Sequence, residues 1–259
     1  MTAPLLPLVY NPRSGSGGMD LDALLARLPK EVRERLQPVR LELPFDYAPV
    51  IAQAKAAGGP LLVWGGDGTL HHAGRALATL GCPVALAAVP GGSGNGLVRG
   101  LRTPLDPAGA VVRLLEGRDL AMDLPRLDGE PFLNLCGTGF EAEVAHAFDG
   151  QKGRGFLGYV KHCLRLWRQH PELRLTWEAQ VPASAEAQSR MDRLRAAWRG
   201  PEPELPDRAW SLCFANLPQY GSGLWIAPGA DPRNGGLNWV RLDRPGLWDL
   251  VTQVPQLFR

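Results

Sequence analysis

Three glycine-rich segments of this chain have the residue types needed to bind a phosphate group. They are NPRSGSGG from Asn11 to Gly18, GGDGT from Gly65 to Thr69 and PGGSGNG from Pro90 to Gly96. Backbone N–H groups in a concave turn bind phosphates, and glycine permits the positive φ angles and the close approach that such a turn requires. Each segment alone is more often an ordinary loop, whereas the three together predict a nucleotide phosphate site.

Asp67 is the only acidic residue inside these segments. Its carboxylate would repel a phosphate unless Mg²⁺ lies between them, or unless it accepts a proton from an attacking hydroxyl group. Both roles fit phosphoryl transfer, so we predict Asp67 as the catalytic residue and as the metal ligand. We expect Thr69 to cap a helix that begins near Leu70.

Side chains of the other two segments add further donors. Arg13 offers a guanidinium group, Ser14 and Ser93 offer hydroxyl groups, and Asn95 offers an amide. The chain contains no GxxxxGK[ST] motif, and GGSGNG does not match the GxGxxG fingerprint. The absence of both motifs excludes a P-loop NTPase and a dinucleotide-binding motif.

Each glycine-rich segment follows a short apolar run that predicts a strand: Leu5 to Tyr10, Leu61 to Trp64 and Val84 to Val89. Up to about residue 120 such runs alternate with helical patterns, which predicts a parallel sheet flanked by helices. The carboxyl ends of parallel strands meet at one edge, where open α/β folds bind ligands. We therefore predict that the three segments converge.

Beyond Asp123 the pattern changes to short β-like runs separated by Gly and Pro. We predict an α/β nucleotide-binding domain at 1–122 and a mainly β domain at 123–259. Helical patterns at 155–169 and 183–198 interrupt the second domain, and the one at 183–198 is either an excursion from that domain or a poorly ordered linker. The predicted strands there are Phe132 to Cys136, Leu173 to Trp177, Ser211 to Ala215 and Leu237 to Leu242.

Composition narrows the class of protein. With 45% hydrophobic residues the chain can bury a core. With a net charge of +2, nucleic acid is not the default partner. Four widely spaced cysteines are typical of thiols in a reducing cytoplasm. No apolar run approaches the ~20 residues that span a bilayer, so we expect any membrane contact to be peripheral.

In this order and at these separations, the three segments resemble the diagnostic motifs of the diacylglycerol kinase catalytic domain superfamily, which includes sphingosine and ceramide kinases. Cys136 to Val144 resembles the stretch that opens the family's second domain. Asn216, Tyr220 and the segment Ile226 to Ala230 resemble a later family motif. The resemblance covers nearly the whole chain.

The resemblance implies an α/β domain related to phosphofructokinase and NAD kinase, followed by a β-sandwich that holds a lipid. It implies that ATP and Mg²⁺ are used, that Asp67 activates a lipid hydroxyl group, and that Glu143 lies near the lipid head group. The complete predicted nucleotide-binding set is Asn11, Arg13, Ser14, Gly65, Gly66, Asp67, Gly68, Thr69, Ser93, Gly94 and Asn95.

The chain departs from the family pattern at several positions. His71 and His72 stand where the family usually has Asn-Glu, and Gly96 stands where bacterial members commonly have Asp. The family also continues past Arg259 to a late Asp-Gly-Glu motif. Asp128 to Glu130 has the same three letters, but its position predicts a turn.

Three functions follow from these observations. The chain is predicted to be an active lipid kinase, with two alternatives: a nucleotide- or lipid-binding relative that has lost catalysis, or a kinase for a soluble substrate such as NAD. A homodimer is also left open, in which a neighbouring subunit supplies the missing segment. The basic face of the helical pattern at 155–169 is either an ordinary surface or a contact with anionic lipid.

Overall fold

A computed structural model of the chain describes residues 4–15, 18–42, 44–148, 165–177 and 205–246. The chain divides into two compact units. Unit 1 contains Met1–Cys136, Cys213–Val240 and Gly246–Arg259, and unit 2 contains Gly137–Leu212 and Arg241–Pro245. The domain ranges 1–122 and 123–259 stay a prediction.

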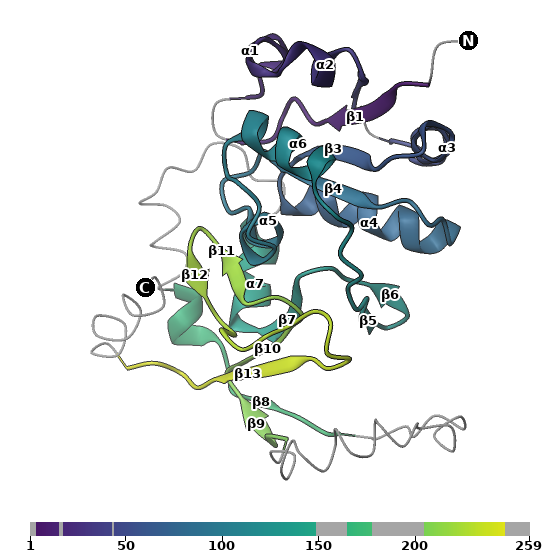
Figure 1. Ribbon diagram of the computed structural model, residues 1–259. Coiled ribbons are helices and arrows are strands. Elements are labelled where there is room, and N and C mark those ends of the chain that lie inside the picture. The colour runs from purple at the N-terminus through teal and green to yellow at the C-terminus, as the bar shows by residue number, and fades with distance from the viewer. Residues whose placement is uncertain (1–3, 16–17, 43, 149–164, 178–204, 247–259) are drawn as a thin grey trace, which may run out of the picture. The chain divides into compact units, whose positions relative to one another are not determined.

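Unit 1 is built on a sheet of four parallel strands in the order β2-β1-β3-β4 (Figure 1). The inner strands β1 and β3 are almost entirely buried, which explains why their sequences are continuous apolar runs. The predicted α/β fold is confirmed. The strands are β1 (Leu6–Tyr10), β2 (Leu36–Arg40), β3 (Leu61–Gly65) and β4 (Leu86–Pro90).

Helices cover both faces of this sheet (Figure 1). Leu62 and Trp64 of β3 pack with helices α1 and α6, while Leu61 and Val63 pack with α3 and α4. Successive side chains of a strand point to opposite faces, so one apolar strand supplies two cores. The helices are α1 (Leu21–Arg27), α2 (Lys30–Arg33), α3 (Ala48–Ala57), α4 (Asp67–Leu80), α5 (Gly96–Gly100) and α6 (Pro107–Glu116).

Two short hairpins also belong to unit 1. Strands β5 (Arg126–Leu127) and β6 (Glu130–Pro131) are antiparallel. Asp128 and Gly129 join them with φ angles of 51° and 81°, the positive pair that a type I′ turn requires. The turn predicted at this position is confirmed. The second hairpin pairs β11 (Gln219–Gly221) with β12 (Leu224–Trp225).

The strand predicted at Ser211 to Ala215 is confirmed, and that at Leu237 to Leu242 begins one residue later. The strand predicted at Phe132 to Cys136 lies instead at Leu135–Gly139, and of Leu173 to Trp177 only Leu173–Arg174 is a strand. One sheet has the order β13-β10-β7, and β8 pairs with β9 in antiparallel fashion. These strands are β7 (Leu135–Gly139), β8 (Leu173–Arg174), β9 (Arg208–Ala209), β10 (Ser211–Ala215) and β13 (Asn238–Leu242).

Helix α7 (Phe140–Phe148) was not expected from the sequence. The predicted helix at 183–198 lies outside the described residues. Of the pattern at 155–169 only residues 165–169 are described, and they are helical. No helix within the described ranges is both long and apolar enough to cross a membrane.

Candidate functional site

The three glycine-rich segments meet at the carboxyl edge of the unit 1 sheet, because β1, β3 and β4 are parallel neighbours. The side-chain amide of Asn11 donates to the Thr69 hydroxyl at 3.1 Å, which joins the first segment to the second. The backbone N–H of Gly66 donates to the Ser14 hydroxyl at 3.4 Å. The predicted convergence is confirmed.

The second and third segments lie backbone to backbone. A Cβ atom added at Gly92 would lie 2.7 Å from the Cα atom of Gly66, and one added at Gly91 would lie 3.0 Å from the backbone nitrogen of Gly65. Backbone atoms cannot move aside as a side chain can. Glycine is therefore required here by close approach rather than by chain flexibility.

Helix α4 begins earlier than predicted. Its first residue is Asp67 and its N-cap is Gly66, whose carbonyl accepts a hydrogen bond from the Leu70 N–H at 3.0 Å. The prediction that Thr69 caps this helix is wrong, because Gly66 supplies the extended cap and the Thr69 hydroxyl accepts the Asn11 amide. The GGDGT segment is thus the first turn of a 14-residue helix, whose early N–H groups have no intrahelical partner.

This first turn is open to a ligand at one position. A Cβ atom added at Gly68 would meet no atom within 4 Å, and Gly68 itself is exposed. The N-terminus of a helix attracts anions through its free N–H groups and its dipole. The turn can therefore accept a phosphate group on the Gly68 side.

The half-buried carboxylate of Asp67 is held by the third segment. Its Oδ2 atom accepts the Gly96 N–H and its Oδ1 atom accepts the Leu97 N–H, both at 3.0 Å. Asp67 therefore lies at the N-terminus of α5 as well as in the first turn of α4. A carboxylate has about four acceptor positions, so each oxygen keeps one for a metal ion or a proton.

The third segment folds into a concave turn around Asn95. The Asn95 side chain accepts the Gly92 N–H and donates to the Gly92 carbonyl, both at 2.8 Å, and its φ angle is 49°. No described residue accepts a hydrogen bond from the N–H groups of Ser93, Gly94 or Asn95. Successive free N–H groups at such a turn form an anion-binding nest.

Gly96 has no room for a side chain. A Cβ atom there would lie 2.5 Å from the backbone oxygen of Tyr220 and 2.8 Å from the side-chain nitrogen of Asn134. The β11–β12 hairpin thus contacts the third segment so closely that no side chain fits. This contact was not predicted from the sequence.

His71 follows Asp67 by one turn of α4 and is half-buried. Burial lowers the pKa of the His71 imidazole, and the positive charges of His72 and Arg75 lower it further, against a smaller opposite effect of Glu130. His71 therefore favours its neutral form in the neutral pH range. It adds no fixed positive charge beside the candidate site.

Glu143 lies in unit 2, on α7, whereas the nucleotide-binding candidates lie in unit 1. Its Oε2 atom is 3.0 Å from Nδ1 of His170, a side chain only 2% exposed. The two atoms are close but do not form an aligned hydrogen bond, since Nδ1 has no such partner among the described residues. The other ring nitrogen of His170 lies 3.1 Å from the backbone oxygen of Trp210. No spacing in the sequence indicated this pair.

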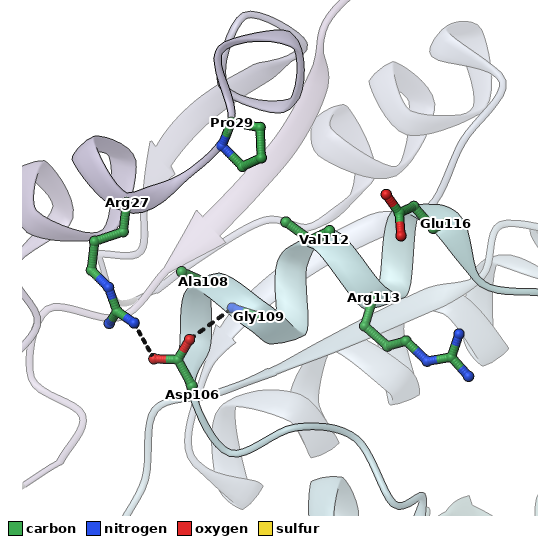
Figure 2. Close-up of a pocket in the computed structure, with 8 residues that line it drawn as sticks. All are labelled: Arg27, Pro29, Asp106, Ala108, Gly109, Val112, Arg113 and Glu116. Atoms are coloured by element: carbon green, nitrogen blue, oxygen red, sulfur yellow. Dashed lines mark hydrogen bonds and ion pairs between the residues drawn. The ribbon is translucent and has the colours of Figure 1, made fainter.

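A surface pocket of about 400 Å³ lies between α1 and α6 (Figure 2). The Arg27 guanidinium pairs with Asp106 at 2.8 Å, and Asp106 also caps α6 by accepting the Gly109 N–H at 2.9 Å. The Gly109 hydrogen bond, and then Arg27, hold the pKa of Asp106 below its usual value. None of the eight residues that line the pocket belongs to a glycine-rich segment, so this pocket is separate from the candidate site.

The fold and the site define an α/β domain that presents glycine-rich loops and helix N-termini at the carboxyl edge of a parallel sheet. Residues 6–127 match the diacylglycerol kinase catalytic domain. This part of the chain, a little under half of its length, therefore carries a domain of that family.

Curated relatives match part of the chain. The protein named "Probable lipid kinase YegS-like" from Pseudomonas fluorescens is 38% identical over 100 residues, which cover 38% of this chain and 33% of the relative. The protein of the same name from Klebsiella pneumoniae is 32% identical over 105 residues, or 40% of this chain and 35% of the relative. The matched segment thus spans about a third of these relatives.

Solved structures share the fold over most of the chain. A diacylglycerol kinase structure from Bacillus anthracis has a TM-score of 0.63 at 22% sequence identity, covering 95% of this chain and 76% of that chain. Another structure from the same organism has a TM-score of 0.66 at 21% identity, covering 100% and 81%. At these identities the similarity shows the fold alone.

Proposed function

We propose that this protein is an ATP-dependent lipid kinase, which transfers the γ-phosphoryl group of ATP to a hydroxyl group of a diacylglycerol- or sphingosine-like lipid. The observation that carries the proposal is the meeting of three glycine-rich segments around Asp67. They present the free N–H groups of a helix first turn beside those of the nest at Ser93 to Asn95. The names of the curated relatives support the same class of reaction.

In the proposed reaction these N–H groups bind the phosphates of ATP, with Arg13 at the exposed rim. The lipid hydroxyl oxygen forms a bond to the γ-phosphorus as the bond from that phosphorus to the β,γ-bridging oxygen breaks. ADP leaves, and the hydroxyl proton passes to a base. Asp67 is the proposed base, because each oxygen keeps one acceptor position besides the one that binds a backbone N–H.

Asp67 is also the residue that would hold Mg²⁺. The described residues contain no group of three or more His, Cys, Asp or Glu side chains that could hold a metal ion alone. Mg²⁺ bound to nucleotides commonly takes one or two protein carboxylates together with phosphate oxygens, so a single carboxylate fits this role. When bound, the ion would neutralise phosphate charge.

The lipid defines the rest of the proposal. A lipid substrate would lie at a membrane surface, so we propose a cytoplasmic protein in peripheral contact with the membrane. We also propose that Glu143 lies near the lipid head group. The domains at 1–122 and 123–259 would then hold the nucleotide and the lipid respectively. A homodimer also belongs to the proposal.

The experiment that tests this function is transfer of labelled phosphate from ATP to a panel of diacylglycerol, sphingosine, ceramide and glycerol lipids, with and without Mg²⁺. We expect Mg²⁺-dependent labelling of at least one lipid. Nucleotide binding without labelling of any lipid would favour a catalytically impaired relative. Labelling of NAD in a parallel reaction, with no lipid labelled, would contradict the lipid substrate class.

Asp67→Asn tests the proposed role of Asp67 as the base. We expect turnover to fall by roughly 10²-fold or more, since the substitution removes a proton acceptor and a charge. An amide would also replace one of two oxygens that accept backbone N–H groups. Thermal unfolding and nucleotide affinity must therefore be measured with turnover. Wild-type turnover in Asp67→Asn would contradict its role as the base.

A further inference from the structure

The third glycine-rich segment is held in shape by residues outside it. The backbone N–H of Ser222, in the β11–β12 hairpin, donates to the Gly94 carbonyl at 2.8 Å, and its hydroxyl donates to the Ser93 carbonyl at 3.4 Å. The Nε atom of Arg99, on α5, donates to the same Gly94 carbonyl at 3.2 Å. All of these residues belong to unit 1.

These hydrogen bonds determine where the free N–H groups of the segment point. The peptide unit is planar and trans, so its carbonyl and its N–H point in opposite directions. Holding the Ser93 and Gly94 carbonyls toward Ser222 and Arg99 therefore turns the Gly94 and Asn95 N–H groups the other way. The Asn95 amide holds the Gly92 carbonyl, which directs the Ser93 N–H in the same manner.

A carbonyl that turned toward the nest would weaken it. Its oxygen carries partial negative charge and would repel a phosphate at the place where an N–H group should donate. Ser222 is held with a φ angle of 52°, a conformation that is uncommon for a residue with a side chain. Ser222 and Gly223, with φ angles of 52° and 87°, form the two-residue turn between β11 and β12, so the hairpin fixes this conformation beside the third segment.

We infer that Ser222 and Arg99 are positioning residues, which hold the Ser93 and Gly94 carbonyls away from the phosphate site so that the N–H groups of Gly94 and Asn95 face a nucleotide. This inference rests on the proposed function. Neither residue needs to touch the nucleotide, because both act through the backbone of the third segment.

The test compares wild type with Ser222→Ala, Arg99→Met, the double variant and Arg99→Lys. Ser222→Ala removes the hydroxyl hydrogen bond to Ser93 and keeps the backbone hydrogen bond to Gly94. Arg113→Met is the matched control, because Arg113 lies on α6 and has no hydrogen bond or ion pair with the described residues of the glycine-rich segments. We expect the double variant to bind ATP and ADP about tenfold more weakly, each single variant to lose less, and Arg99→Lys to recover part of the loss. The melting temperature and kcat should stay near wild type while the KM for ATP rises.

Two outcomes separate this inference from the proposed function. If the wild-type protein bound no nucleotide, the proposed function would be contradicted. The positioning role would then be tested directly by the amide NMR resonances of Gly94 and Asn95. Those resonances should shift in the double variant and stay unchanged in Arg113→Met. Unchanged resonances, or wild-type nucleotide affinity in the double variant, would overturn the inference.

Discussion

Asp67 in unit 1 and Glu143 in unit 2 are two carboxylates that the sequence singled out, and different kinds of partner hold them. Two backbone N–H groups hold Asp67, each bound at 3.0 Å. Glu143 is 51% exposed and faces a single buried side chain, His170, at 3.0 Å. The position of the Asp67 carboxylate therefore depends on the path of the backbone, whereas that of Glu143 depends on the neighbouring His170 ring.

This difference explains why one site follows from the glycine pattern and the other does not. Backbone donors are available wherever a loop has the right shape, and glycine marks the positions where that shape is needed. A partner such as His170 leaves no local pattern, because it lies 27 residues from Glu143 along the chain and meets it only through packing. We therefore expect substitutions that displace the backbone of unit 1 to have larger effects than the loss of the Glu143 side-chain contact in unit 2.

The largest effect is expected where two backbones touch. Gly92→Ala would place a Cβ atom 2.7 Å from the Gly66 Cα atom, so the two segments must separate. We expect a destabilisation of about 1–3 kcal/mol and a loss of nucleotide affinity of ~10-fold or more. Calorimetry and thermal unfolding measure both quantities.

Gly229→Ala is the control for this substitution. A Cβ atom at Gly229 would meet only the side-chain nitrogen of Asn238, at 3.9 Å, which is an ordinary contact. Nucleotide affinity should be unchanged in this variant. If Gly92→Ala also bound nucleotide like wild type, the close approach of the two segments would have no part in binding, and the comparison would fail.

A smaller effect is expected in unit 2. Glu143→Gln removes the charge beside buried His170, and because Glu143 is half exposed we expect a loss of only about 1 kcal/mol in unfolding free energy. Nucleotide affinity should not change. Glu172→Gln is the matched control, since its partner Arg208 is 56% exposed and lies at 3.5 Å.

Chemical unfolding of the two variants decides whether burial of the partner matters. Glu172→Gln should lie within ~0.5 kcal/mol of wild type, as is usual for exposed ion pairs. Equal stability of Glu143→Gln and Glu172→Gln would show that His170 contributes nothing to holding Glu143. A rise in lipid KM in Glu143→Gln alone would support the proposed place of Glu143 near the lipid head group.

The smallest effect is expected for a buried hydroxyl group, that of Tyr47. The Tyr47 hydroxyl is buried without a hydrogen-bond partner among the described residues, and burial raises the pKa of Tyr47 from 10.0 to about 12. Tyr47→Phe should therefore change the free energy of unfolding by less than ~1 kcal/mol at neutral pH.

The alkaline range provides a sharper measurement on the same residue. Above pH 10 the unfolded chain loses the tyrosine proton while the folded protein keeps it, so wild-type stability should fall as the pH rises from 10.0 to about 12. Tyr47→Phe should remove that part of the fall. Parallel alkaline unfolding curves for the two proteins would show that Tyr47 ionises equally in both states.

The sequence by itself determined the features that depend on residues close together along the chain. Continuous apolar runs predicted β1, β3 and β4, because a strand buried on both faces needs apolar residues at every position. The parallel topology then required their loops to meet. The turn at Asp128 and Gly129 was also predicted, and two positive φ angles form it.

Only the tertiary structure decided which groups hold one another. It placed both oxygens of Asp67 on α5, 29 and 30 residues further along the chain, and Ser222 beside Ser93, 129 residues away. It also moved the start of α4 to Asp67, since Gly66 acts as the cap and Thr69 binds Asn11 instead. Backbone conformation is restricted by each residue and its neighbours, whereas these contacts arise from the packing of distant segments, which no local pattern records.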